Sequence, residues 1–379
     1  DYSLEALTDA TKWWFHDEDY WTTLLDTMAK SRLNWLDIHG TYDISVTDFP
    51  NLYAYFVTSP SFPEVGVPSA VKQANLAQLN HVIAMAHARG IRVSMMSYEA
   101  KLTVPHRRHV PYESTEANAY TYTREVVTET IKGVPGLDAI GFRIGESGRG
   151  ESFFNCYTEA VKLAGREIPL LTRSWITRRQ RVLPLARACK DFTVQIKYNG
   201  EHWGAPYMVA GGRVANWYSY SFEDYLSDAG SPEKNAKTWP GNAVSPPPTP
   251  PRDTDIRGEG SWPSNPYKIV WQVRANGTHR IFPFYSPEWV RRTVGCMKVG
   301  TASGYTIEGL DAYFPKRPEY YLADPSKKAY DWIHQRDFMY WSTWGRLGYD
   351  PTVPDSTFDK QAVRMLSGDT PSLTLPQGE

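Results

Sequence analysis

Segments typical of strands alternate with segments typical of helices along most of the chain. Short apolar runs at residues 91–99 and 192–199 are typical of buried strands. Between such runs, apolar residues recur at helical spacing, as Leu79 and Ile83 do before Gly90, which favours the end of a helix. This alternation predicts a parallel sheet whose strands are joined by crossover helices.

The number of predicted strands indicates the architecture. We expect eight strands, near residues 11–15, 34–39, 91–99, 137–144, 168–175, 192–199, 268–274 and 305–308. Eight strands that alternate with helices predict an α/β fold, a (β/α)8 TIM barrel, and the 379 residues fit a single barrel domain over residues 1–379. The first strand has the weakest pattern, so a seven-stranded or irregular barrel is the alternative.

Residues 200–266 interrupt the alternation of strands and helices, because they contain no clear helix of ordinary length. They include a proline-rich stretch at residues 245–251 and many Trp and Tyr residues. An irregular insertion of this length is usually functional. We expect an insertion after strand six that lies over the active-site face as one wall of a cleft; a surface linker is the alternative.

Composition excludes some classes of function and favours others. A net charge of −1 argues against nucleic-acid binding, and no apolar stretch is long enough to span a membrane. Aromatic residues make up 14% of the chain, which suits the packing of sugar rings but also occurs in large cores. The spacing of Cys156, Cys189 and Cys296 predicts buried thiols. We expect no metal and no cofactor, because no phosphate-loop, dinucleotide or zinc motif is present.

The stretch around Gly141 is the most informative part of the predicted barrel. Ala139, Gly141 and Gly145 share one side of a short strand and leave room for a close neighbour. Arg143 lies on the same side, and Glu146 follows the strand. Buried charges of this kind are costly unless they are paired or used. They predict either a buried ion pair or part of a site.

Other predicted strands also end in polar residues of one parity. Asp37 and His39, Gln195 and Lys197, and Thr306 and Glu308 alternate with apolar neighbours. Inward polar and outward apolar residues would produce this pattern in a barrel. The carboxyl ends of barrel strands carry the active site, so we predict a site at this face.

The residue types predict carbohydrate chemistry. Pairs of carboxylates can cleave a glycosidic bond, and an excess of cations suggests an acidic sugar as ligand. The candidate catalytic residues are Glu146, Glu308, Glu201, His39 and Lys197. The candidate substrate-binding residues are Arg143, Arg173, Trp175, Tyr198, His202, Arg274, Asn276 and Glu99.

Two segments resemble a known class of barrel enzyme. The barrel order and the segment at residues 344–351 resemble the α-glucuronidase type of glycoside hydrolase, and the start at residues 28–40 resembles the first helix and second strand of polysaccharide-degrading barrels. The resemblance implies a TIM-barrel polysaccharide-degrading enzyme with Glu146 as the acid. Arg274 and Asn276 stand where the commonest retaining clan has its nucleophile, so Glu308 or Glu201 would be the base of an inverting reaction.

The leading hypothesis is therefore a glycoside hydrolase for uronic-acid or sulfated oligo- or polysaccharides. A lyase or dehydratase that eliminates from uronate-containing oligosaccharides is one alternative, with Lys197, Tyr198, His202 and His39 as candidate residues. A non-catalytic sugar-binding barrel is the other. No signal peptide is seen, yet such a function favours a secreted or periplasmic protein. The expected partner is an anionic oligosaccharide, and oligomeric state stays open.

Overall fold

The computed structural model describes most of the predicted elements. It covers residues 13–39, 52–97, 115–145, 147–174, 179–197, 266–273, 286–297, 302–308 and 331–366, with residues 102, 112, 113 and 177. The predicted insertion at residues 200–266 lies outside the described residues, apart from Pro266. The insertion and the single-domain assignment therefore stay predictions.

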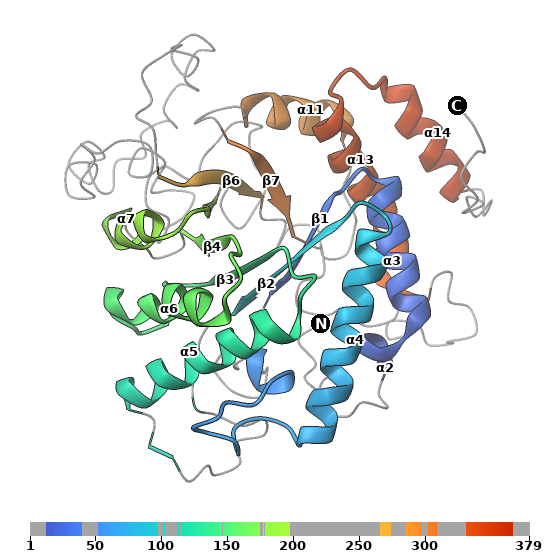
Figure 1. Cartoon of the computed structure of the whole chain (residues 1–379). Helices are drawn as coiled ribbons and strands as arrows, with labels where there is room; N and C mark the ends of the chain where they lie inside the picture. The colour runs from blue at the N-terminus through green and yellow to red at the C-terminus, as the bar shows by residue number, and fades with distance from the viewer. Residues whose placement is uncertain are drawn as a thin grey trace.

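Seven parallel strands form one sheet, in the order in which they occur in the chain (Figure 1). The strands are β1 (Trp35–His39), β2 (Arg92–Ser97), β3 (Ala139–Phe142), β4 (Leu170–Arg173), β5 (Phe192–Lys197), β6 (Lys268–Val273) and β7 (Gly304–Ile307). Parallel strands in sequential order need a crossover after every strand. This order is that of an α/β barrel and confirms the predicted fold class.

The sheet is curled. Gln195 on β5 donates a hydrogen bond from Nε2 to Asp37 Oδ2 on β1, with 2.8 Å between the two atoms. Strands in a flat sheet lie about 4.8 Å apart, so these two strands would be separated by about 19 Å. The hydrogen bond therefore requires the sheet to bend until β1 and β5 face each other across an interior.

Helices cover the outside of this sheet (Figure 1). The helices are α2 (Trp13–His16), α3 (Glu18–Lys30), α4 (Ser69–His87), α5 (Glu116–Gly133), α6 (Asn155–Ala164), α7 (Arg179–Ala188), α11 (Pro287–Cys296), α12 (Ile333–Arg336), α13 (Phe338–Tyr349) and α14 (Asp355–Leu366), with short 3-10 turns at Leu52–Tyr55 and Glu151–Phe154. Gly165 ends α6 with a φ of 68°, a left-handed conformation that glycine adopts easily, and Ser286 caps α11.

The predicted first strand is wrong. Residues 13–16 form the short helix α2, and within the described residues the sheet has seven strands. Trp14 and Phe15 make edge-on ring contacts with Tyr20 and Trp21 of α3, and Trp21 Nε1 donates to the carbonyl of Phe15 at 2.8 Å. Aromatic residues favour strands, but here packing on a neighbouring helix decides the conformation.

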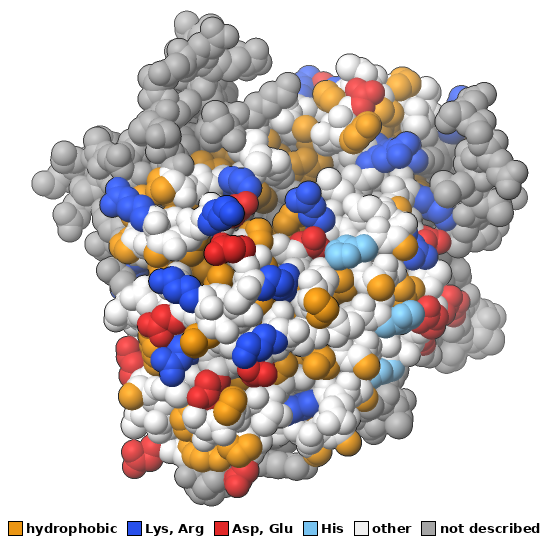
Figure 2. Space-filling view, in the orientation of Figure 1, with side chains coloured by type: hydrophobic (Ala, Val, Ile, Leu, Met, Phe, Trp, Pro, Cys, Tyr) orange, Lys and Arg blue, Asp and Glu red, His pale blue; other side chains and the backbone are white. Residues whose placement is uncertain are grey.

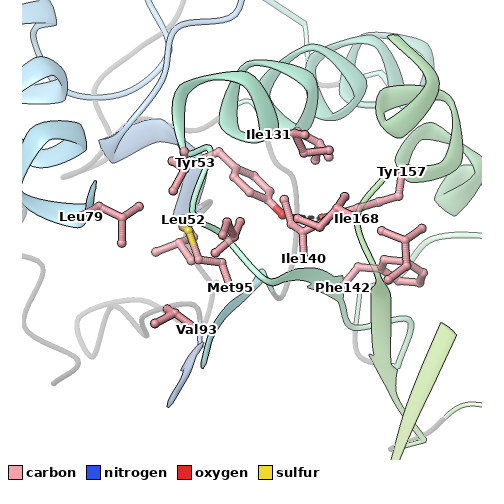
Figure 3. Close-up of a cluster of buried hydrophobic side chains, with 14 of the residues drawn as sticks. Leu52, Tyr53, Leu79, Val93, Met95, Ile131, Ile140, Phe142, Tyr157 and Ile168 are labelled. Carbon is pink, nitrogen blue, oxygen red and sulfur yellow. Dashed lines mark hydrogen bonds between the residues drawn. The ribbon is translucent and has the colours of Figure 1, made fainter. Parts of the chain in front are cut away.

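Most of the apolar core lies between the sheet and the helices. Figure 3 shows Met95 and Ile140 from the strands packed with Leu79 and Ile131 from α4 and α5. A separate cluster of Met96, Ala139 and Leu171 lies on the other side of the sheet. A Cβ on Gly141 would come within 2.3 Å of Leu171 Cδ1. The small residues of β3 therefore leave room for a side chain of β4, as predicted.

The helix layer carries side chains of both charges, and Cys156 and Cys189 are free thiols. Acidic and basic side chains alternate over α5 to α7 on the face that Figure 2 shows, as in the pair formed by Arg124 and Glu159. Cys156 is buried and free, whereas Cys189 is a free thiol that is only half-buried. Across the described part of the chain, the helices are too short or too polar to cross a membrane.

Candidate active site

Strand register places the polar residues of one parity on the inner side of the sheet. Asp37 pairs with Ser94, Arg173 with Gln195, and Lys197 with Gln272. Their neighbours of opposite parity, such as Val93 and Val194, belong to the core beneath the helices. The alternation seen in the sequence is therefore the alternation between the barrel interior and the helix layer.

The first interior cluster is centred on Asp37. His39 Nε2 lies 2.7 Å from Asp37 Oδ2, and Gln195 Nε2 donates to the same oxygen. Ser94 donates from Oγ to Asp37 Oδ1 at 2.9 Å, and Trp35 Nε1 donates to Ser94 Oγ at 2.7 Å. Side chains from β1, β2 and β5 thus fix one carboxylate, and His39 joins it at the carboxyl end of β1.

The surroundings of Asp37 favour its charged form. Burial acts to raise the pKa of Asp37, but the charge of His39 and the hydrogen bonds from His39, Gln195 and Ser94 outweigh it and lower the pKa below its usual value. The side chain of Asp37 is 12% exposed, and that of His39 is 29% exposed. The more exposed imidazole is therefore the part of this pair that a ligand can reach.

The second interior cluster contains Glu308, which directly follows β7. Gln272 Nε2 donates to Glu308 Oε1 at 2.6 Å, and Arg173 Nη2 lies 3.5 Å from the same oxygen. Arg173 Nη2 also donates to Gln272 Oε1. Tyr340 of α13 donates from its hydroxyl to the backbone carbonyl of Glu308 at 3.1 Å. Two side chains therefore orient the carboxylate, and a third holds the backbone that carries it.

The exposed fractions of the side chains distinguish the residues that support this cluster from the one that a substrate can reach. Arg173 and Gln272 are buried, whereas the side chain of Glu308 is 21% exposed. Arg143, after β3, is also buried, and its backbone N–H donates to the carbonyl of Ser97. The guanidinium of Arg173 therefore contacts protein groups, Gln272 and Glu308, and is itself buried. The carboxylate is the accessible group of the cluster.

The structure brings together some of the predicted site residues. His39, Arg143, Arg173 and Glu308 lie at carboxyl ends of neighbouring or facing strands. Lys197 ends β5, but only its backbone is described. Eight candidates lie outside the described residues: Glu99, Glu146, Trp175, Tyr198, Glu201, His202, Arg274 and Asn276. Their roles stay predictions.

Ser94 is the interior residue that the sequence analysis missed. It lies between Val93 and Met95, both of which pack under the helices, so its inward position follows the same alternation. Asp37 and Gln195 showed the inward parity in the sequence but were not assigned to the site, and the strand register gives Gln272 the same parity. In the part of the chain that the structure describes, no group of three His, Cys, Asp or Glu side chains is placed to hold a metal ion.

Comparisons with known proteins support the fold. The sequence matches no protein-family model and no curated protein. Its structure is similar to that of a GH138 enzyme targeting pectin rhamnogalacturonan II, with a TM-score of 0.60 and 18% identity over 94% of this chain and 37% of that one. An exo-β-1,4-mannosidase from Opitutaceae bacterium strain TAV5 gives 0.46 and 14% identity, over 87% of this chain and 56% of that one. This chain spans a little over one third and a little over one half of these two enzymes. Its α/β barrel is therefore similar in fold to that of the GH138 glycoside hydrolase.

Proposed function

We propose that the chain is a glycoside hydrolase that acts on acidic oligo- or polysaccharides at the carboxyl end of its barrel. The observation that carries the proposal is the partly exposed carboxylate of Glu308, oriented by Gln272 and Arg173. Active sites of α/β barrels lie at this end, and glycosidases use carboxylates there.

The geometry around Glu308 suits one of the two carboxylates that a glycosidase uses. Gln272 and Arg173 both reach Oε1 of Glu308, so the carboxylate has a fixed orientation before a substrate arrives. In this position Glu308 would activate a water molecule as the base. Glu146, which follows β3 in the sequence, would protonate the leaving oxygen, as the resemblance to α-glucuronidases implies.

The acidic character of the substrate rests on the interior cations. Arg173 contributes positive charge next to the proposed base, Arg143 is a buried cation that directly follows β3, and Arg274 follows β6 in the sequence. The similar GH138 enzyme targets a pectin, rhamnogalacturonan II. Uronic-acid polymers of this kind are the first substrates to test. A secreted or periplasmic location fits a polymer that cells cannot take up.

One observation also favours elimination from a uronate. His39 is held by a mostly buried carboxylate, the arrangement of an oriented base that removes a proton next to a carboxylate group. The products separate the two reactions, because a lyase creates an unsaturated sugar that absorbs in the ultraviolet, whereas a hydrolase creates only a new reducing end.

The experiment is product analysis with rhamnogalacturonan II, polygalacturonate and mannan. We expect new reducing ends without ultraviolet absorbance from an acidic polymer, and much less from the same polymer after its carboxyl groups are reduced. Ultraviolet-absorbing products would establish the lyase instead. Binding of the polymers without either product would show a sugar-binding barrel.

A further inference from the structure

Among the described residues, His39 contacts the protein through only one of its ring nitrogens. Nε2 lies 2.7 Å from Asp37 Oδ2, whereas Nδ1 has no hydrogen-bond partner among the described residues. The residue ends β1 at the carboxyl edge of the sheet, with 29% of its side chain exposed. The ring therefore has a fixed inner nitrogen and a nitrogen left over for a ligand.

The surroundings of Asp37 determine where the imidazole proton lies. Ser94 and Gln195 both donate to the carboxylate, and the Ser94 hydroxyl is oriented because its oxygen already accepts from Trp35 Nε1. A carboxylate that receives such donors acts only as an acceptor. The remaining contact, with His39, then requires a proton on Nε2.

We propose that Asp37 is a positioning residue that, in the neutral form of the His39 ring, fixes the proton on Nε2, so that Nδ1 accepts a hydrogen bond from a sugar hydroxyl. This inference rests on the proposed function for the class of ligand. The ligand hydroxyl donates its hydrogen to the lone pair of Nδ1, and no covalent bond is made or broken. His39 thereby helps to place the sugar ring at the mouth of the barrel.

A second His–Asp pair of similar length shows why the barrel pair is special. His87 Nε2 lies 2.8 Å from Asp138 Oδ2, but both residues are on the outside of the barrel and the other donor to Asp138 is a backbone N–H. The side chain of His87 is 41% exposed. Only the pair at Asp37 is tied by side chains from three strands, as pre-organisation of a binding group requires.

Nuclear magnetic resonance tests the proton position directly. The full chain is labelled with nitrogen-15 in its nine histidines, so that each imidazole ring gives its own signals. The signals of His39 are assigned as those that disappear in the His39→Gln variant. We expect His39 to be protonated on Nε2 in the ligand-free neutral ring. Addition of a galacturonic-acid trisaccharide should shift Nδ1 of His39 and leave His87 unchanged. A proton on Nδ1, or a mixture of both forms, would overturn the role of Asp37.

Kinetics on the acidic polymer test the role of Nδ1. The amide of Asn overlaps the position of Nδ1, whereas that of Gln overlaps Nε2. His39→Gln should therefore raise KM by about three- to tenfold, the worth of one hydrogen bond, and His39→Asn should raise it less. The reverse order would mean that only the contact with Asp37 matters and would contradict the proposal.

A double-mutant cycle shows whether Asp37 acts through His39. Asp37→Asn alone should raise KM by a similar factor with kcat little changed, and it should add nothing in the His39→Gln background. Additive effects would contradict the positioning role. Glu18→Gln is the matched control, because Glu18 contacts His81 on the exposed outer surface and should leave KM unchanged. If the wild-type chain cleaves no polymer, the proposed function fails, and the magnetic resonance result still decides whether Asp37 positions the ring.

Discussion

The barrel interior and the seam between helix α3 and helices α12 and α13 bury polar groups in opposite ways. We define the seam as the contact of α3 with α12 and α13. Figure 1 shows α3 and α13 side by side. In the interior, the pKa of Asp37 is lowered, so a mostly buried group is kept charged. In the seam, burial lowers the pKa of His334 to about 4 and raises that of Tyr20, so both groups are kept neutral. Asp37 thus keeps its charge where a ligand can reach it, whereas His334 and Tyr20 stay neutral where α3 and α12 meet.

The seam contains the segment that carried the resemblance to α-glucuronidases. A Cβ on Gly345 would lie 1.8 Å from the carbonyl oxygen of Ser31, and one on Gly348 would lie 1.9 Å from the hydroxyl of Tyr305. That hydroxyl donates to the carbonyl of Trp344 at 2.5 Å. The two glycines therefore let α13 approach α3 and β7 closely. The segment serves packing in this fold.

The largest expected difference between the two regions is in turnover. Glu308→Gln should lower kcat by about 10²–10⁴-fold, the usual contribution of a general acid–base group, because the amide cannot accept a proton. The free energy of unfolding should change by no more than about 1 kcal/mol, since Gln can keep the contacts with Gln272 and Arg173. Steady-state rates and denaturant unfolding measure both quantities. Glu159→Gln is the control, because Glu159 also binds an arginine but lies on the helix layer; equal rates for the two variants would remove Glu308 from the mechanism.

The next effect concerns the seam. Gly345→Ala should lower the free energy of unfolding by about 3 kcal/mol, because the added methyl overlaps the backbone of Ser31 and α13 must move. Turnover per folded molecule should be close to that of the wild type. Gly295→Ala in α11 is the matched control: no atom lies within 4 Å of the added methyl, and the change should stabilise the helix slightly. Equal stability of the two variants would mean that the close approach at the seam is not needed.

Acid should weaken the seam through His334. Its pKa is about 4 in the folded chain, against an ordinary value of 6.5, because burial disfavours the charged form. Between pH 6.5 and about 4, His334 binds a proton in the unfolded chain but not in the folded chain. The contribution of His334 to the free energy of unfolding is therefore fully present above pH 6.5 and is lost as the pH falls toward 4. The loss reaches about 3 kcal/mol at most. His334→Gln, which can keep the contact with Thr23, should flatten this part of the pH profile, whereas His81→Gln should not. An unchanged profile in His334→Gln would assign the acid sensitivity to other groups.

The sequence predicts the barrel well and the first helix badly, for a physical reason. Strand parity depends on local alternation, so the inward positions of Gln195 and Glu308 follow from the sequence alone, whereas the strand that ends at Arg173 shows no clear alternation. The conformation at Trp14 depends on ring contacts with another helix, which local patterns do not contain. The pairing of Asp37 with Gln195 depends on the curl of the sheet, and no feature of either strand reveals its partner across the interior.

The central claim is that the Arg173, Gln272 and Glu308 cluster is there for chemistry rather than for stability. The most direct test is the free energy of unfolding of the triple variant Arg173→Met, Gln272→Leu, Glu308→Leu. Apolar side chains of similar size often replace a buried ionic cluster without loss, or with a gain of about 1–4 kcal/mol. We therefore predict an inactive variant at least as stable as the wild type, to within about 1 kcal/mol. A loss of more than about 3 kcal/mol would contradict the claim and make the cluster a structural ion pair.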